Sequence, residues 1–297
     1  LGITARSRSL DSSATLTAAC TTLAIAGYNP GSDVYQHNRL DLDQKAMEGA
    51  LASYDFTTAK THYTTGGNSH GSSGARTLQG FSTSAQSKMY TTSTTCPGCP
   101  YKHYKQFYDY YGDFDYADKW VSAALDGTSN FAFTSGEHGP SDFATLGDAA
   151  RVEAVKKGTA YMHVWMYVIR EFEDAIDDCQ TCTSDCNSFS LNSGPVHAWD
   201  EGVAFYTGSL EGTEVGGSSS GKMVYRLAEK RCANFGTCGA SGTSASGTAK
   251  VNIDLFAQFD AGKAALDVGN CAAVRPIVDK IVSLMTVPLV QGSLRYA

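Results

Sequence analysis

Nine cysteines constrain the fold of this chain more than any other feature of its sequence. Most of them stand in short clusters; the full set is Cys20, Cys96, Cys99, Cys179, Cys182, Cys186, Cys232, Cys238 and Cys271. A Cys-x-x-Cys pair can bind zinc or exchange disulfides, and in a secreted chain it can close a small loop as a structural disulfide. Because Ser/Thr/Gly-rich loops surround the clusters, we favour structural disulfides, which predict a secreted or periplasmic protein. The odd count leaves one thiol unpaired or bonded elsewhere.

The composition excludes two classes of protein. Acidic residues outnumber basic ones by 30 to 23, which gives the 297-residue chain a formal net charge of −7. A protein that binds nucleic acid by charge normally carries a basic stripe, and this sequence has no long run of Lys or Arg. No apolar run reaches the roughly 20 residues that a membrane-spanning helix needs. We therefore expect neither a nucleic-acid partner nor a membrane-spanning segment.

Hydrophobic periodicity predicts a mainly α fold. Apolar residues recur at helical spacing in many segments, whereas alternating strand patterns with hairpin turns are scarce. The expected helices span residues 14–26, 41–54, 56–63, 101–124, 143–178, 196–210, 222–235, 251–265 and 273–285. Long Ser/Thr/Gly-rich loops separate them. We predict a flexible N-terminal arm over residues 1–13 and one bundle-like helical domain over residues 14–297, held together by several disulfides.

One internal similarity indicates a duplication. Residues 56–68 resemble residues 259–270, and each segment follows an alternating apolar and Asp/Asn stretch. Repeated segments of this kind predict a duplicated helical hairpin.

Acidic residues gather near the end of the helix expected over residues 143–178. Glu171, Asp174 and Asp178 share one face of that helix. Repulsion between like charges on one face is relieved when a cation sits between them. Acids at a helix C-terminus also oppose the helix dipole, which favours a functional reason for their presence. The alternative is a solvated helix end, because charge clusters usually face water.

A second group of metal-binding residue types lies in the helix expected over residues 196–210. His197 and Glu201 are four residues apart, so their side chains point to the same side of the helix. Iron accepts mixed imidazole and carboxylate donors, and helical bundles assemble such sites from facing helices. Glu153 would add a carboxylate from a third helix, since we suspect a break near Gly158 in the helical stretch over residues 143–178. The predicted metal site therefore consists of Glu153, Glu171, Asp174, His197 and Glu201.

The same region carries a family resemblance. The run Trp199-Asp-Glu-Gly-Val-Ala-Phe-Tyr-Thr-Gly-Ser-Leu-Glu-Gly212, together with Gly27-Tyr-Asn-Pro-Gly31 and Arg39-Leu-Asp-Leu-Asp-Gln-Lys45, resembles the low-iron-inducible, Fe-assimilating periplasmic proteins of green algae. The resemblance covers roughly residues 20–297. It implies secretion into the space between plasma membrane and cell wall, and a role in iron uptake.

These observations lead to one hypothesis and two alternatives. The hypothesis is a non-enzymatic periplasmic protein that binds Fe2+ or Fe3+ and passes it to a plasma-membrane iron transporter or reductase. Arg151 and Lys156 are candidates for holding bicarbonate as a synergistic anion. The first alternative is a cell-wall or surface structural protein that responds to CO2 or iron status without a specific metal site. The second, an enzyme such as a di-metal oxidase or a hydratase, is disfavoured because paired Glu-x-x-His motifs are missing.

Overall fold

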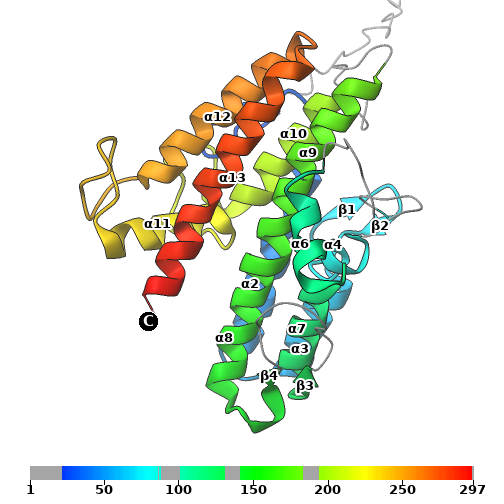
Figure 1. Ribbon diagram of the computed structural model, residues 1–297. Coiled ribbons are helices and arrows are strands. Elements are labelled where there is room, and N and C mark those ends of the chain that lie inside the picture. Colours follow the sequence, from blue (N-terminus) through cyan, green and yellow to red (C-terminus); the bar gives the residue numbers. More distant parts are fainter. Residues whose placement is uncertain (1–21, 86, 88–100, 131–140, 183–193, 296–297) are drawn as a thin grey trace, which may run out of the picture.

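One long helical run passes through the molecule and carries other helices at both of its ends (Figure 1). It consists of α8 (Asp148–Gly158), the π-helical segment η2 (Thr159–Val164) and α9 (Trp165–Thr181). The computed structural model describes residues 22–85, 87, 101–130, 141–182 and 194–295. The two ends of the long run belong to two groups of helices.

The first group surrounds α8 and is built mainly from the N-terminal half of the chain. It contains α2 (Leu40–Leu51), α3 (Phe56–Thr65) and α7 (Tyr116–Asp126). Helix α2 packs against α3, and α7 packs against both α3 and α8. The short helices α4 (Gly80–Thr83) and α6 (Tyr104–Tyr111) contact α7 and α9, respectively.

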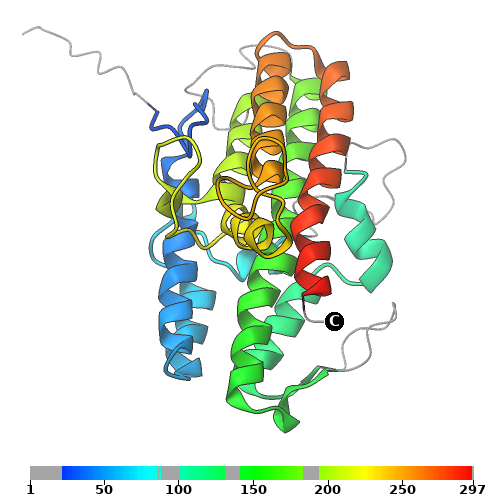
Figure 2. The ribbon, with the colours of Figure 1, turned by 90° about the vertical axis from the view of Figure 1, so that its left-hand side faces the viewer.

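The second group is a bundle around α9, built mainly from the C-terminal half of the chain. Its members α10 (Pro195–Thr207), α12 (Lys250–Asp267) and α13 (Cys271–Leu294) lie alongside α9, as Figure 2 shows from the side. Helix α11 (Val224–Phe235) runs across this bundle and contacts α10, α12 and α13. The four-residue helix α1 (Tyr35–Asn38) packs against α10.

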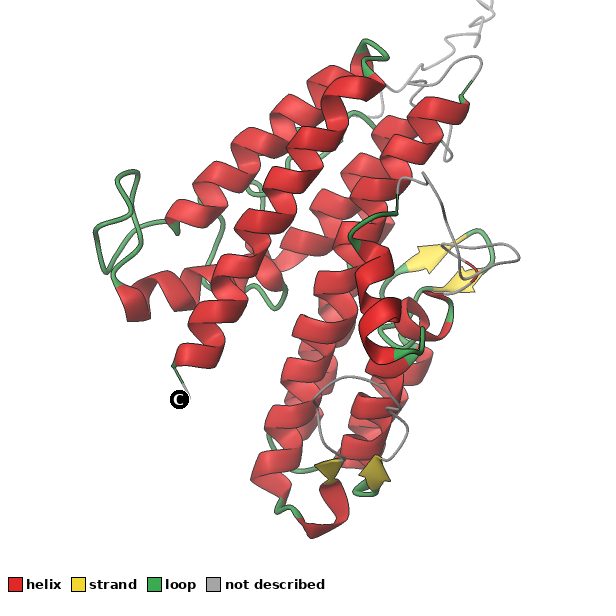
Figure 3. Ribbon diagram, in the orientation of Figure 1, coloured by secondary structure: helices red, strands yellow, loops and turns green. Residues whose placement is uncertain are grey.

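Strands contribute little to the described residues, as the colouring in Figure 3 shows. Strands β1 (His70–Gly71) and β2 (Gly74–Ala75) form one antiparallel hairpin, in which His70 faces Ala75. Strands β3 (Ser129–Asn130) and β4 (Ser141–Asp142) form another antiparallel pair. Two short 3-10 helices complete the elements, η1 (Phe143–Thr145) and η3 (Ser209–Glu211).

Helix α10 lies at the centre of the C-terminal bundle, because every one of its residues except Glu201 is buried. A helix that is apolar on all sides belongs in the interior of a protein. Its Trp199 side chain is fully buried and donates a hydrogen bond from Nε1 to the backbone oxygen of Phe259 on α12, at 2.9 Å. Proline at the first helical position and glycine after the last one set its limits. Because α10 is packed on all sides, the positions of the side chains that it carries are fixed by their neighbours.

The mainly α fold is confirmed, but several expected boundaries are wrong. Residues 22–26, the described part of the helix expected over 14–26, form an extended turn. The helix expected over 101–124 is divided at Gly112, which adopts the left-handed conformation (φ 69°) and ends α6. Helix α13 continues through Pro276 and Pro288 to Leu294, well past the expected end. The suspected break near Gly158 is a change from α to π geometry.

The expected duplicated hairpin is not seen in the second copy. Residues 56–65 form α3 and follow α2 after a short turn, so the first copy is a hairpin. Most of the matching residues, 259–267, lie inside α12, which is one uninterrupted helix. The two segments share residues but fold differently.

The prediction of structural disulfides is confirmed for the described cysteines that the structure pairs. Cys179 at the end of α9 bonds Cys271 at the start of α13, and Cys232 in α11 bonds Cys238 in the following loop. Cys182 is disulfide-bonded as well. The Cys96–Cys99 cluster, Cys20, Cys186 and the predicted arm over residues 1–13 lie outside the described residues.

Among the described helices, none combines the length and the apolar character that crossing a membrane requires.

Candidate metal centre

Two of the predicted ligands meet on the first turns of α10. His197 and Glu201 stand one helical turn apart, and Nε2 of His197 lies 3.0 Å from Oε1 of Glu201. The spacing of four residues brings them to one side of the helix, as expected. The pair lies where α1 packs against α10, since Glu201 also contacts a residue of α1.

A third residue that the sequence did not indicate completes the group. Nε2 of His37, on α1, lies 2.9 Å from the same Oε1 atom of Glu201. One ligand atom from each of His37, His197 and Glu201 lies within 4.8 Å of the other two. We call these three residues the His-His-Glu cluster.

The His-His-Glu cluster is largely shielded from solvent. His37 and His197 are 6% and 5% exposed, and the Glu201 side chain is 18% exposed. The ring of His37 packs edge-on against the rings of His197 and Phe205, with centroids 5.3 and 5.7 Å away. Phe205 in turn contacts the stacked rings of Phe81 and Tyr167. Such apolar surroundings strengthen electrostatic interactions inside the site.

The hydrogen bonds around His197 fix which of its ring nitrogens carries a proton. Ser32 donates from its hydroxyl to Oδ2 of the fully buried Asp200, at 2.8 Å. The Ser32 oxygen also lies 3.0 Å from Nδ1 of His197, so it accepts the proton of that nitrogen. A neutral imidazole has only one N–H group. Nε2 of a neutral His197 therefore presents a lone pair to Glu201.

The surroundings of His37 lead to the same conclusion. A guanidinium N–H of Arg76 is within hydrogen-bonding distance of Nε2 of His37, and arginine can only donate. Nε2 of His37 must then hold a lone pair, and the proton sits on Nδ1, which is buried without a hydrogen-bond partner among the described residues. Two imidazole lone pairs and a carboxylate oxygen thus converge on one place, an arrangement that can bind a metal ion.

The pKa of His37 agrees with a neutral imidazole at that position. Burial lowers the pKa of His37 from its ordinary value, against the opposite effect of Glu201. The pKa of Asp200 is raised to about 6 by burial, although hydrogen bonds from Tyr28 and Ser32 lower it.

The distances suit the coordination of a divalent ion. Two ligand atoms that are each about 2.1 Å from one ion and 90° apart lie about 3.0 Å from each other. Oε1 of Glu201 lies 2.9 Å from Nε2 of His37 and 3.0 Å from Nε2 of His197. Side chains spaced in this way can surround one face of an ion and leave its other positions open.

The structure places Glu171 and Asp174 apart from this cluster. Both lie on α9, which packs against α10, but both carboxylates pair with Arg170. The Nη1 atom of Arg170 is 2.7 Å from Glu171, and its Nη2 atom is 2.8 Å from Asp174. Asp174 also accepts a hydrogen bond from the Tyr101 hydroxyl. The positive charge between these two acids therefore comes from the guanidinium of Arg170.

The fifth predicted ligand, Glu153, lies on α8 in the other helical group. It pairs with Lys156 at 3.3 Å and with Lys157, and its side chain is 50% exposed. Arg151, predicted with Lys156 to hold an anion, donates to the backbone oxygens of Ala124 and Leu125. The structure thus brings together His197 and Glu201 but not Glu153, Glu171 or Asp174.

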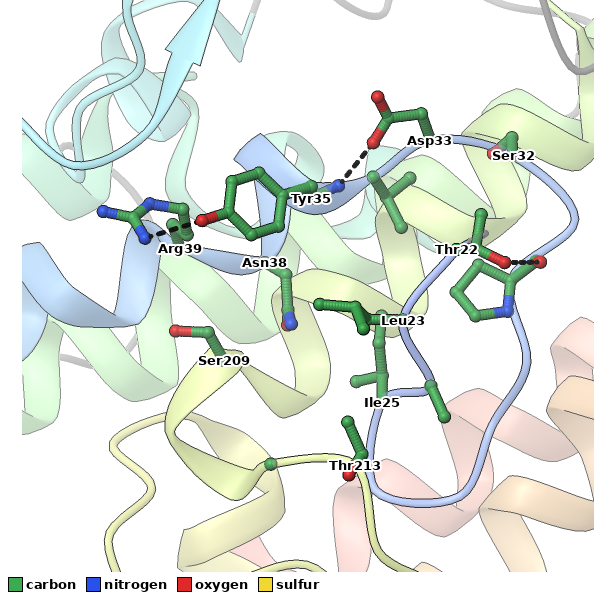
Figure 4. Close-up of a pocket in the computed structure, with 14 residues that line it drawn as sticks. Thr22, Leu23, Ile25, Ser32, Asp33, Tyr35, Asn38, Arg39, Ser209 and Thr213 are labelled. Atoms are coloured by element: carbon green, nitrogen blue, oxygen red, sulfur yellow. Dashed lines mark hydrogen bonds between the residues drawn. The ribbon is translucent and has the colours of Figure 1, made fainter. Parts of the chain in front are cut away.

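A hollow is lined by Ser32 and by none of the three residues of the His-His-Glu cluster. Its volume is about 370 Å³, and Figure 4 shows Thr22, Leu23 and Ile25 on one side of it and Tyr35, Asn38 and Arg39 on the other. Leu23 and Ile25 are apolar, and Ser32 is its link to His197. The hollow is therefore a neighbour of the candidate metal centre rather than part of it.

Sequence reasoning missed His37, Ser32 and Arg76. His37 stands far from α10 in the sequence, and no spacing rule connects it with His197. A weak signal was available, because His37 and Ser32 fall between two of the segments that carry the family resemblance, residues 27–31 and 39–45.

Comparison with known proteins identifies the family. Residues 9–297 match the model of the Fea1 family, which is described as a low iron-inducible periplasmic protein. Searches of curated proteins and of solved structures found no match to the chain. Because the family model covers nearly the whole chain, the chain belongs to the Fea1 family of low iron-inducible periplasmic proteins.

Proposed function

We propose that this protein binds ferrous iron in the periplasm, with His37, His197 and Glu201 as its protein ligands. The observation that supports this most strongly is the convergence of two histidine Nε2 atoms on one carboxylate oxygen, at 2.9 and 3.0 Å. Without a cation, the lone pairs of two neutral imidazoles would face a negative charge in a buried place. A bound ion resolves this conflict.

The donor set favours iron in its divalent state. Two histidines and one carboxylate with open positions are the usual ligands of non-haem Fe2+. Zinc also accepts such a set, so the ligands by themselves do not choose between the two metals. Induction by low iron is the property for which the family is described, and it favours iron as the cargo.

The surroundings support a binding site whose ligands are held in advance. Asp200 and Ser32 orient the His197 ring from behind, as second-shell groups do in metal proteins. The family description confirms the periplasmic location expected from the cysteines, and it names no catalysed reaction. We therefore assign the site to iron uptake without catalysis, with delivery to a plasma-membrane transporter or reductase.

Titration with metal tests the proposal. Protein purified without added metal is titrated with Fe2+ under argon, and in parallel with Zn2+ and Fe3+, by calorimetry or by competition with a coloured chelator. We expect one Fe2+ per chain. Since loss of an outer-shell group already costs about 10–100-fold in affinity, loss of a ligand in His37→Ala, His197→Ala or Glu201→Gln is expected to cost about 100-fold or more.

Two control variants separate ligand loss from other effects. His62→Ala removes a histidine of α3, and Glu153→Gln removes a carboxylate that pairs with lysines. Both should bind iron like the unchanged protein. Thermal unfolding monitored by circular dichroism shows whether each variant remains folded. Folded cluster variants that keep full affinity would show that the metal site lies elsewhere, and an unchanged protein that binds no metal would favour a structural role in the cell wall.

A further inference from the structure

A metal ion bound at the His-His-Glu cluster would have to displace the contact between Arg76 and His37. Arg76 follows strand β2, and its guanidinium donates from Nη1 to the backbone oxygen of His70 and from Nη2 to Nε2 of His37. Its side chain forms no salt bridge with a carboxylate among the described residues. The guanidinium of Arg76 is thus half-buried and lies beside Nε2 of His37, a proposed metal ligand. Its positive charge is not compensated by a carboxylate in direct contact.

Binding of a cation takes away the acceptor that Arg76 uses. Nε2 of His37 has one lone pair, and a metal ion and the Nη2 proton of Arg76 cannot both use it. The other ring nitrogen, Nδ1, carries the proton and cannot accept in its place. Once the metal is bound, the Nη2 group must find another acceptor close to the ion.

The charges in the loaded site also call for an anion. A divalent ion and the Arg76 guanidinium together bring three positive charges, and Glu201 supplies one negative charge. The excess positive charge would be largely buried, which is unfavourable unless it is compensated. Three protein ligands leave coordination positions open on an iron that prefers more. An anion that ligates the metal and accepts from Arg76 solves both problems.

We propose that the loaded site also binds a small planar oxyanion, which ligates the iron and is held by Arg76. This inference rests on the proposed function. The guanidinium is a planar fork of donors that matches two oxygens of a carbonate or carboxylate group. Arg76 therefore takes the anion-binding role first expected of Arg151 and Lys156, whose donors are used by backbone oxygens and by Glu153.

The experiment measures Fe2+ affinity in bicarbonate-free buffer under argon, and again with bicarbonate, acetate or sulfate added. Bicarbonate and acetate distinguish the two sources of a planar oxygen pair, and sulfate is the tetrahedral control. Since coupling between sites typically changes affinity about 5–150-fold, we expect about a tenfold gain in Fe2+ affinity from the preferred planar anion. By reciprocity, radiolabelled bicarbonate or acetate should be retained in equilibrium dialysis only when the metal is present.

Arg76→Gln is the critical variant, and Arg39→Gln is its control. Arg39 also donates to a backbone oxygen, that of Asn68, but is stacked on Tyr35 rather than directed at the His-His-Glu cluster. We expect Arg76→Gln to lose the anion effect and to bind Fe2+ more tightly than the unchanged protein when no anion is present. Arg39→Gln should keep the anion effect.

The outcomes separate this inference from the proposed function. If the unchanged protein binds Fe2+ at the His-His-Glu cluster with the same affinity in every buffer, the anion proposal is wrong and the metal site stands. An equal gain from sulfate would overturn the assignment of a planar anion. If Arg76→Gln keeps the full anion effect, Arg76 is not the anchor. Failure to bind Fe2+ in any buffer would overturn both proposals.

Discussion

The hydroxyl of Ser32 lies 3.0 Å from Nδ1 of His197, a residue 165 positions further along the chain. The same hydroxyl donates to Asp200 at 2.8 Å, and the Ser32 backbone N–H donates to that carboxylate oxygen at the same distance. The loop before α1 and the first turn of α10 are thereby held together. His37 lies on α1, directly after that loop, so the link that orients His197 also helps to set the place of the second histidine.

Substitution of Ser32 tests this link. Ser32→Ala removes the acceptor for the Nδ1 proton of His197 and one donor to Asp200, so the imidazole loses its fixed orientation. We expect Fe2+ affinity to fall by about 10–100-fold, the usual effect of losing an outer-shell partner. Competition titration measures it. Ser53→Ala, which removes a hydroxyl bonded only to the backbone oxygen of Ala50, is the control. Equal affinities for the two variants would contradict the orienting role of Ser32.

The close contact between α10 and α12 gives a second prediction. A Cβ atom on Gly262 would lie 1.9 Å from Cζ2 of the fully buried Trp199, so Gly262→Ala must push the two helices apart. We expect a loss of about 1–3 kcal/mol in the free energy of unfolding, as for other overpacked cores. Because Trp199 lies between His197 and Glu201 on α10, Fe2+ affinity should fall too.

Gly49 supplies the matched comparison. It lies in α2 with no atom within 4 Å of an added Cβ, so alanine meets no obstacle there. Gly49→Ala should raise the free energy of unfolding by about 0.5–1 kcal/mol, because alanine loses less conformational freedom in a helix. Urea unfolding of both variants checks the pair. A tolerated Gly262→Ala would mean that α10 and α12 are less closely packed than the structure shows.

The helices could be predicted because their signals are local. The apolar periodicity that indicates α9 and the His197–Glu201 spacing on α10 each depend on a few neighbouring residues. The pairing of α9 with α10 was also anticipated when acids on facing helices were combined. The contact of α1 with α10 could not be predicted, because it joins two segments that are far apart in the sequence. Neither segment has a sequence pattern that indicates the other as its partner.

The acids of α9 show why side-chain roles are harder to predict than helix faces. Arg170 reaches two carboxylates, that of the adjacent Glu171 and that of Asp174 one helical turn further on. Glu173 accepts from the backbone N–H groups of His103 and Tyr104 and so supports the start of α6. These acids therefore form ion pairs and hydrogen bonds within the fold. The four-residue spacing of Arg170 and Asp174 is one that helical periodicity reports, whereas the partners of Glu173 come from a distant segment, which the spacing within α9 does not report.

The disulfide between Cys179 and Cys271 should contribute more stability than the one between Cys232 and Cys238. The first closes a loop with a sequence separation of 92 and the second one of 6. Loop-closure entropy then predicts losses of about 4–5 and about 2 kcal/mol in the free energy of unfolding when both partners are replaced by Ser. Urea unfolding of the two double variants measures the difference. Equal losses would show that restriction of the unfolded chain is not the main contribution.

A buried histidine away from the metal centre makes stability depend on pH. His163 in η2 is fully buried, and its Nε2 lies 2.7 Å from the hydroxyl of Tyr63, which donates to Asp118. Burial lowers the pKa of His163 to about 4. In the unfolded chain a histidine has a pKa of about 6.5, so between these values the unfolded state binds a proton that the folded state does not. Stability must therefore fall as the pH falls through this range.

The expected loss from His163 between pH 7 and pH 5 is about 2 kcal/mol in the free energy of unfolding. Denaturant unfolding at both pH values measures the total loss, to which other titrating groups contribute. His163→Gln retains a donor toward Tyr63 but cannot titrate, so it should show a loss that is smaller by this amount. Parallel pH profiles for the variant and the unchanged protein would show that His163 takes up its proton in the folded state. A smaller loss in the variant would mean that the interior around η2 keeps this histidine neutral.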